Sequence, residues 1–115
     1  MSTTAAVLRE VYAERTSQDR KWGEQNHPDG TGPSVLVLYG GGSENLDLRY
    51  GLELANHFRE RCDKRHKQGW GSYLDILLEE VFEAAAENGT DALRAELLQV
   101  AAVAVAWVEK LDRGM

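Results

Sequence analysis

A turn flanked by two helical stretches constrains the fold of this chain more than any other feature of its sequence. The turn is Asn88-Gly89-Thr90, and the residues on either side of it have the apolar periodicity of α-helices. We therefore expect the two helices to fold back on each other as an antiparallel hairpin. Glu83 lies about as far before the turn as Glu96 lies after it. Glu80 and Gln99 are matched in the same way one helical turn further out, so all four side chains should meet at one level.

The residue types at this level predict a metal site. Three carboxylates that converge without a nearby lysine or arginine repel one another in a partly dry environment, and a hard divalent cation with oxygen ligands relieves that repulsion. We therefore predict a magnesium site, with manganese as the alternative cation. Its predicted ligands are Glu80, Glu83, Glu96 and Gln99. The competing interpretation is an ordinary solvated acidic face of a helix.

The helix after the turn predicts self-association. Between Leu97 and Val108 it is apolar almost all the way round, which indicates burial on every side. Three other helices cannot cover such a helix in a chain of 115 residues, so we expect a homodimer or a homotetramer. Burial of Glu96 without a partner would be costly, and a bound cation would remove that cost.

Composition favours one soluble, cytoplasmic domain that spans residues 1–115. A chain of 115 residues with 43% hydrophobic residues is long enough for one compact core and too short for two. The formal charge of −6, from 13 basic and 19 acidic side chains, disfavours binding to nucleic acid or to an anionic membrane. The single cysteine, Cys62, cannot form an internal disulfide, which fits a reducing compartment. We find no secretory signal, and the longest apolar run is shorter than a membrane span.

Periodicity and turn signals divide the chain into four helices, which predicts an all-α, four-helix-bundle-like fold completed by oligomerisation. Residues 35–39 are β-prone, but we see no second strand to pair with them, so we expect an extended loop or a small edge contact rather than a sheet, followed by flexible glycines at 40–42. Ser72 and Asp75 have the spacing of a capping box at the start of the third helix. The expected helices cover residues 3–21, 43–67, 73–87 and 91–113.

A basic cluster marks the end of the second expected helix. Cations are favourably placed there against the negative end of the helix dipole, which accounts for much of the pattern. The alternative is that these side chains hold phosphate oxygens of a substrate near the metal site. The candidate substrate-binding residues of this cluster are Arg59, Arg61, Lys64 and Arg65.

The two halves of the hairpin resemble the motifs of a known family. The sequence Leu77-Leu78-Glu79-Glu80-Val81-Phe82-Glu83, followed after the turn by Glu96-Leu97-Leu98-Gln99, resembles the Glu-Glu-x-x-Glu and Glu-x-x-Asp signatures of the MazG-like, all-α nucleoside triphosphate pyrophosphohydrolases. The match covers roughly residues 72–111 with the same order and spacing. The segment Lys21-Trp22-Gly23-Glu24-Gln25-Asn26-His27 is also similar to the N-terminal part of actinobacterial and phage-encoded members.

The resemblance implies an activity and a role for each matching residue. Family members use magnesium to hydrolyse a nucleoside triphosphate at its α–β linkage, which releases the monophosphate and pyrophosphate. By position, Glu80, Glu83 and Glu96 are then metal ligands. Glu79 is either a further ligand or the catalytic residue that orients the attacking water. Trp22 lies in a polar stretch, where it either stacks on the substrate's base or covers the bundle as a hydrophobic lid.

The chain departs from the family at Gln99, which stands where the family has aspartate. The amide keeps one oxygen able to coordinate a cation but removes a negative charge. A weaker site, a shifted metal position and loss of catalysis all fit this change. Two alternatives to the enzyme therefore stay open: a catalytically silent binder of a nucleotide or alarmone, and a structural helical module whose basic helix end docks a partner.

Overall fold

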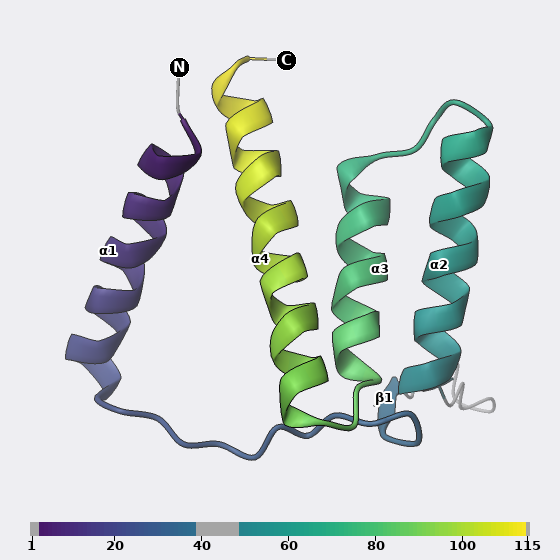
Figure 1. Cartoon of the computed structure of the whole chain (residues 1–115), viewed down its shortest axis with the longest axis horizontal. Helices are drawn as coiled ribbons and strands as arrows, with labels where there is room; N and C mark the ends of the chain where they lie inside the picture. Colours follow the sequence, from purple (N-terminus) through teal and green to yellow (C-terminus); the bar gives the residue numbers. More distant parts are fainter. Residues whose placement is uncertain (1–2, 39–48, 115) are drawn as a thin grey trace, which may run out of the picture. The chain divides into compact units, whose positions relative to one another are not determined.

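A computed structural model describes residues 3–38 and 49–114 of the chain. These residues form four α-helices and one short antiparallel ladder, so the prediction of an all-α fold is confirmed in its main part (Figure 1). They fall into two compact units, one of residues 3–29 and 104–114 and the other of residues 30–38 and 49–103. The bundle, its completion by oligomerisation and the single domain stay predictions. In chain order the elements are α1 (Thr4–Trp22), β1 (Leu36–Leu38), β2 (Arg49–Tyr50), α2 (Gly51–Lys67), α3 (Tyr73–Ala85) and α4 (Thr90–Asp112).

The first unit consists of α1, the segment that follows it and the last turns of α4. The Thr3 hydroxyl caps the start of α1 by accepting a hydrogen bond from a first-turn backbone N–H. Gly23 ends the helix with a positive φ of 70°, a conformation that glycine adopts without steric cost. Val7 on α1 and Val105 on α4 are buried.

The second unit is built on α2 and α3, which pack closely side by side (Figure 1). The rings of Phe58 and Phe82 are stacked between them, with centroids 4.8 Å apart and planes 10° from parallel. Leu54 and Cys62 lie one turn on either side of Phe58 and are buried. The buried stripe of α2 therefore repeats every four residues.

Asp75 fastens the α2–α3 pair at the end where the two helices connect. The predicted capping box is confirmed, because the Ser72 hydroxyl accepts a hydrogen bond from the Asp75 backbone while the Asp75 carboxylate accepts bonds from Ser72. The same carboxylate is 1% exposed and lies 3.2 Å from Arg61 Nε and 3.9 Å from Arg65 on α2. Burial raises the pKa of Asp75, but Ser72 and the two arginines lower it more, so the pKa lies below its usual value of 3.8.

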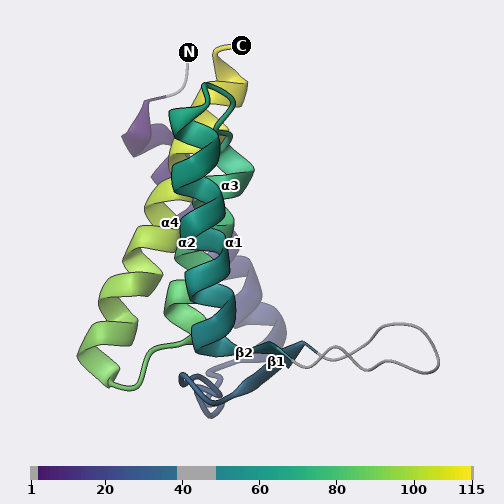
Figure 2. The same cartoon turned by 90° about the vertical axis from the view of Figure 1, so that its right-hand side faces the viewer.

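The start of α2 differs from the prediction. Residues 49–50 form β2, which pairs antiparallel with β1, and α2 begins at Gly51 rather than near residue 43 (Figure 2). The expectation that residues 35–39 would find no partner strand was therefore wrong. A two-residue strand has no periodicity of its own, and Tyr50 lies four residues before Leu54, so its spacing is also that of the helix that follows. The expected glycine loop at 40–42 and helical residues 43–48 lie outside the described residues.

A short segment before β1 joins the start of α2 to the end of α3. The backbone N–H of Gly32 donates to the carbonyl of Ala85 at 2.9 Å, and that of Gly51 donates to the carbonyl of Val35 at 3.0 Å. Gly32 has a φ of 145° and is buried. Gly51 is packed so tightly that a Cβ atom on it would lie 2.5 Å from the carbonyl oxygen of Gly32. Main-chain contacts thus fasten this end of the helix pair.

The apolar helix α4 is not covered on every side within the chain. Leu97 and Leu98 are 52% and 55% exposed, and Val108 is 39% exposed. One chain therefore leaves part of this apolar stretch exposed, as we expected of three covering helices, and pairing with another copy stays a prediction. No helix in the described part of the chain combines the length and apolarity that a membrane crossing requires.

Self-association is tested by the mass in solution. If another copy covers α4, light scattering should give at least twice the 12.8 kDa of one chain. A monodisperse species of single-chain mass at micromolar concentration would contradict this expectation.

Candidate metal centre

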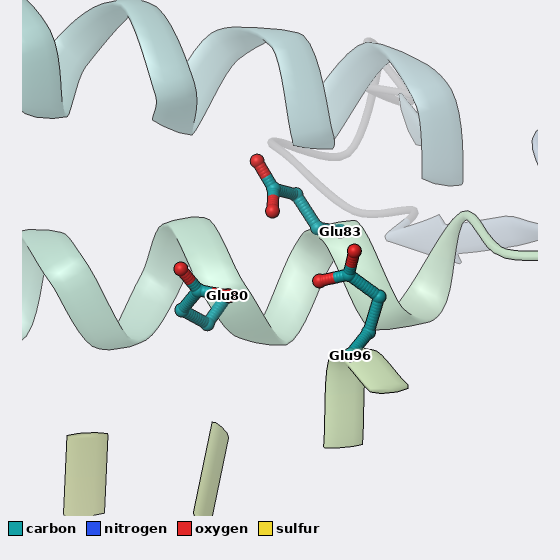
Figure 3. A group of neighbouring side chains, drawn as sticks. All are labelled: Glu80, Glu83 and Glu96. Atoms are coloured by element: carbon teal, nitrogen blue, oxygen red, sulfur yellow. The ribbon is translucent and has the colours of Figure 1, made fainter. Parts of the chain in front are cut away.

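Three glutamates from two helices converge in the second unit. Glu80 and Glu83 lie about one turn apart on α3, and Glu96 lies on α4. Each offers a carboxylate oxygen, and these three oxygens all lie within 4.8 Å of one another (Figure 3). All three side chains are half-buried. The structure thus brings together the three carboxylates that the hairpin alignment predicted.

The connection between α3 and α4 explains why the glutamates meet. After α3 the chain makes one further tight turn, in which the backbone of Ala86 donates to the carbonyl of Phe82. α4 then begins at Thr90, and its first turn is anchored by a hydrogen bond from the Leu93 N–H to the Gly89 carbonyl at 2.8 Å. The short turn predicted at residues 88–90 is therefore present, with the helix starting on its last residue.

The carboxylates disfavour one another's charge. Burial raises the pKa of Glu80 above its usual value of 4.5, and the nearby charges of Glu83, Glu96 and Glu79 raise it further. Burial also raises the pKa of Glu96, together with the charges of Glu83 and Glu87 and a hydrogen bond to Glu83. Two of the three groups therefore hold their negative charge at a cost, which either protons or a cation would reduce.

A positively charged side chain of α2 contacts this glutamate cluster. Arg59 Nε lies 3.2 Å from Glu83 Oε1, and its charge lowers the pKa of Glu96. The expectation that no lysine or arginine lies nearby was therefore wrong. The hairpin alignment considered α3 and α4 alone, whereas Arg59 comes from α2, 24 residues before Glu83. Arg59, which belongs to the predicted basic cluster, thus contacts Glu83, a predicted metal ligand.

Removal of this arginine should strengthen magnesium binding. A cation that binds Glu83 must break or weaken the ion pair, and Arg59 is 48% exposed, so the pair contributes only modestly. We expect Arg59→Met to tighten the magnesium dissociation constant by about two- to fivefold, the equivalent of about 0.4–1 kcal/mol. Calorimetric titration without nucleotide measures this change. Lys67→Met, an exposed position on the same helix, is the control, and weaker binding by the Arg59 variant would show that the arginine supports the site rather than competes at it.

Glu79 faces a different neighbour from the other glutamates. It interacts with the buried thiol of Cys62 on α2, whose pKa is raised to about 12 by burial and then by the hydrogen bond and charge of Glu79. Its charge also raises the pKa of Glu80. Glu79 is therefore close enough to influence the cluster, and its catalytic role stays a prediction.

Two further predicted residues are exposed. Gln99 lies on the exposed surface of α4, three residues after Glu96. Trp22, the last residue of α1, is 61% exposed, and the Lys21 ammonium lies 4.9 Å from the centroid of its ring. Trp22 belongs to the first unit and the glutamates to the second, so its role in stacking on a base stays a prediction.

The other three residues of the basic cluster line a pocket of their own near the end of α2. Its volume is about 410 Å³, and none of the three converging glutamates lines it. The pocket was not predicted, because its aromatic wall, Trp70, comes from the connection after the helix. Its lining residues are His57, Arg61, Lys64, Arg65, Gln68 and Trp70.

Comparison with family models, with curated proteins and with solved structures found no match to this chain. The resemblance to the MazG-like family therefore stays a prediction based on motif residues. Three of the residues that carry the motif, Glu80, Glu83 and Glu96, are also the ones whose carboxylate oxygens converge, whereas Glu79 and Gln99 are not in that group.

Proposed function

We propose that this protein is a magnesium-dependent nucleoside triphosphate pyrophosphohydrolase of the MazG-like kind, which converts a nucleoside triphosphate to the monophosphate and pyrophosphate. The observation that carries the proposal is the convergence of Glu80, Glu83 and Glu96 from two helices, with oxygens within 4.8 Å of one another. Residues with the family's motif spacing could have pointed in unrelated directions. Their convergence is what the proposed chemistry requires.

The donor set fits magnesium. Hard divalent cations prefer oxygen ligands, and the three glutamates supply carboxylate oxygens without a competing nitrogen or sulfur donor among them. The pKa values of Glu80 and Glu96, which are raised by burial and by neighbouring carboxylates, support the proposal that a cation binds at this place. Manganese fits the same ligands. We propose Gln99 as a fourth ligand through its amide oxygen.

We assign the remaining steps of the proposed reaction to other residues near the site. When bound, magnesium supplies positive charge that offsets the charge on the phosphate oxygens. Glu79 would accept a proton from the attacking water, since it lies beside Glu80 but is not one of the three converging carboxylates. Arg59 would leave Glu83 and pair with a phosphate oxygen, a contact for which a guanidinium is well suited.

The test is a panel of nucleoside triphosphates incubated with the protein and magnesium. We expect equimolar monophosphate and pyrophosphate, and no product in EDTA. Release of orthophosphate and a diphosphate would show cleavage at the β–γ linkage and contradict the proposed reaction. Absence of turnover for every triphosphate would contradict enzymatic activity itself.

The silent binder is the second candidate, and the ion pair between Arg59 and Glu83 favours it. An arginine that remains on Glu83 would leave the site with fewer free ligand oxygens, and Gln99 already lacks the charge of an aspartate. Binding of triphosphates in the magnesium panel without any product would identify this case.

Gln99→Asp tests whether the fourth position belongs to the site. The substitution adds a charge at nearly constant volume, so it should tighten magnesium binding severalfold if the four groups share one cation. In the metal-free protein it should lower the melting temperature, and magnesium should restore it. Calorimetry and thermal melts with and without magnesium measure both effects. If neither quantity changes, Gln99 is not a ligand.

A further inference from the structure

We propose that the pocket at the end of α2 is a second, metal-independent site that binds a nucleoside monophosphate or a similar aromatic phosphate monoester. Its volume of about 410 Å³ lies in the range of small-molecule sites. Its lining combines cationic side chains with one large aromatic ring, which are the two kinds of group that such a ligand requires.

The charge of the pocket matches a phosphate monoester. Arg61, Lys64 and Arg65 contribute three positive charges, and the buried carboxylate of Asp75 offsets one of them. The remaining excess of two positive charges corresponds to the roughly two negative charges of a phosphate monoester near neutral pH. Lys64 has no ion-pair partner in the part of the chain that the structure describes. Its ammonium is therefore free to meet a ligand oxygen.

Hydrogen bonding to the last carbonyl groups of α2 does not explain this arrangement. Cations near a helix end often serve the last carbonyl groups, but here the backbone already does so. The N–H groups of Gln68 and Trp70 donate to the carbonyls of Lys64 and Arg65, at 3.1 and 3.0 Å. The three cationic side chains are therefore not needed to cap the helix.

Trp70 supplies a surface for a planar ring. It is 71% exposed, which is unusual for so large an aromatic side chain. Its indole N–H donates to Gln68 Oε1 at 3.1 Å, so the ring is oriented although it is not buried. Bases stack on such rings with little dependence on their identity. The pocket thus selects a phosphate next to a flat ring rather than a particular base.

The pocket is separate from the glutamate cluster. Asp75, which contacts two of its arginines, precedes Glu80 and Glu83 by five and eight residues on α3, or about 7.5 and 12 Å along the helix. Neither glutamate lines the pocket. Binding there should therefore require no divalent cation, and the proposal does not depend on the reaction proposed above.

The test is calorimetric titration of AMP into the full chain in buffer that contains EDTA. We expect AMP to bind, with an affinity that falls as salt is added. Adenosine lacks the phosphate and ribose 5-phosphate lacks the ring, so each should bind at least about tenfold more weakly. Trp70→Ala should weaken AMP binding about tenfold, and Lys64→Gln should weaken it severalfold.

Matched controls locate the site. Tyr12→Ala and Lys67→Gln remove an exposed ring and an exposed cation outside the pocket. Both should leave AMP affinity unchanged. The proposal is overturned if AMP does not bind, if ribose 5-phosphate binds as well as AMP, or if Trp70→Ala leaves the affinity unchanged.

Discussion

Glu80→Gln and Glu83→Gln should each reduce magnesium-dependent pyrophosphate release by at least about 100-fold, because each substitution removes one charged oxygen ligand from the three that converge. The fold should persist, since glutamine has nearly the same shape and the change relieves repulsion within the cluster. The pKa of Glu80 is raised partly by Glu83 and Glu96, so loss of one carboxylate should leave the metal-free melting temperature unchanged or slightly higher. Steady-state kinetics and thermal melts measure the two effects.

Glu60→Gln is the matched control for this pair. Glu60 is exposed on α2 and is not among the converging carboxylates, so the same chemical change there should leave turnover unaltered. Full activity in both cluster variants would show that the glutamates hold no catalytic metal. A lower melting temperature in both would instead indicate that the carboxylates stabilise the fold.

Gly51→Ala should cause a large loss of stability. The added methyl group would lie 2.5 Å from the carbonyl oxygen of Gly32 and 3.2 Å from atoms of Ala85 and Ala86, all of them backbone. Backbone cannot move aside as a flexible side chain can, so we expect a loss of about 3 kcal/mol in the free energy of unfolding, near the upper end for overpacking. Chemical denaturation monitored by circular dichroism measures it.

Gly89→Ala is the control for the glycine substitution. A methyl group there would meet no atom within 4 Å, and Gly89 does not have a positive φ. Its effect should be less than about 1 kcal/mol. Equal losses at both positions would mean that the main-chain contacts of Gly51 with the segment at Gly32 are not what holds this end of the helix pair.

The sequence allowed the helices to be predicted because their signals are periodic and local. The boundaries of α1, α3 and α4 lie within two residues of the expected ones, and the capping box at Ser72 is present as its spacing predicted. The start of α2 was predicted wrongly because strand pairing joins residues far apart in the sequence. Residues 49–50 are too few to contain a repeat that would indicate a strand. The position of that strand depends on β1, which a local pattern cannot show.

The candidate site was predictable to the same extent and for the same reason. Glu80, Glu83 and Glu96 could be aligned because one short turn relates their helices. The contact of Arg59 with Glu83 depends on the packing of α2 against α3, which sequence spacing does not encode. Asp75 was predicted as a capping residue, but its pairing with Arg61 depends on the same packing.

α2 and α3 are held together by contacts at both ends, and these contacts fix the number of residues between Gly51 and Arg65. Gly51 must meet the backbone at one end of α2, and Arg65 must reach Asp75 at the other. One inserted or deleted residue in between would rotate everything beyond it by about 100° around the helix axis, so both ends could not be satisfied together. Arg59 lies between the two ends, and its side chain would no longer point toward Glu83. We therefore expect α2 to tolerate substitutions on its outer face but not a change in its length.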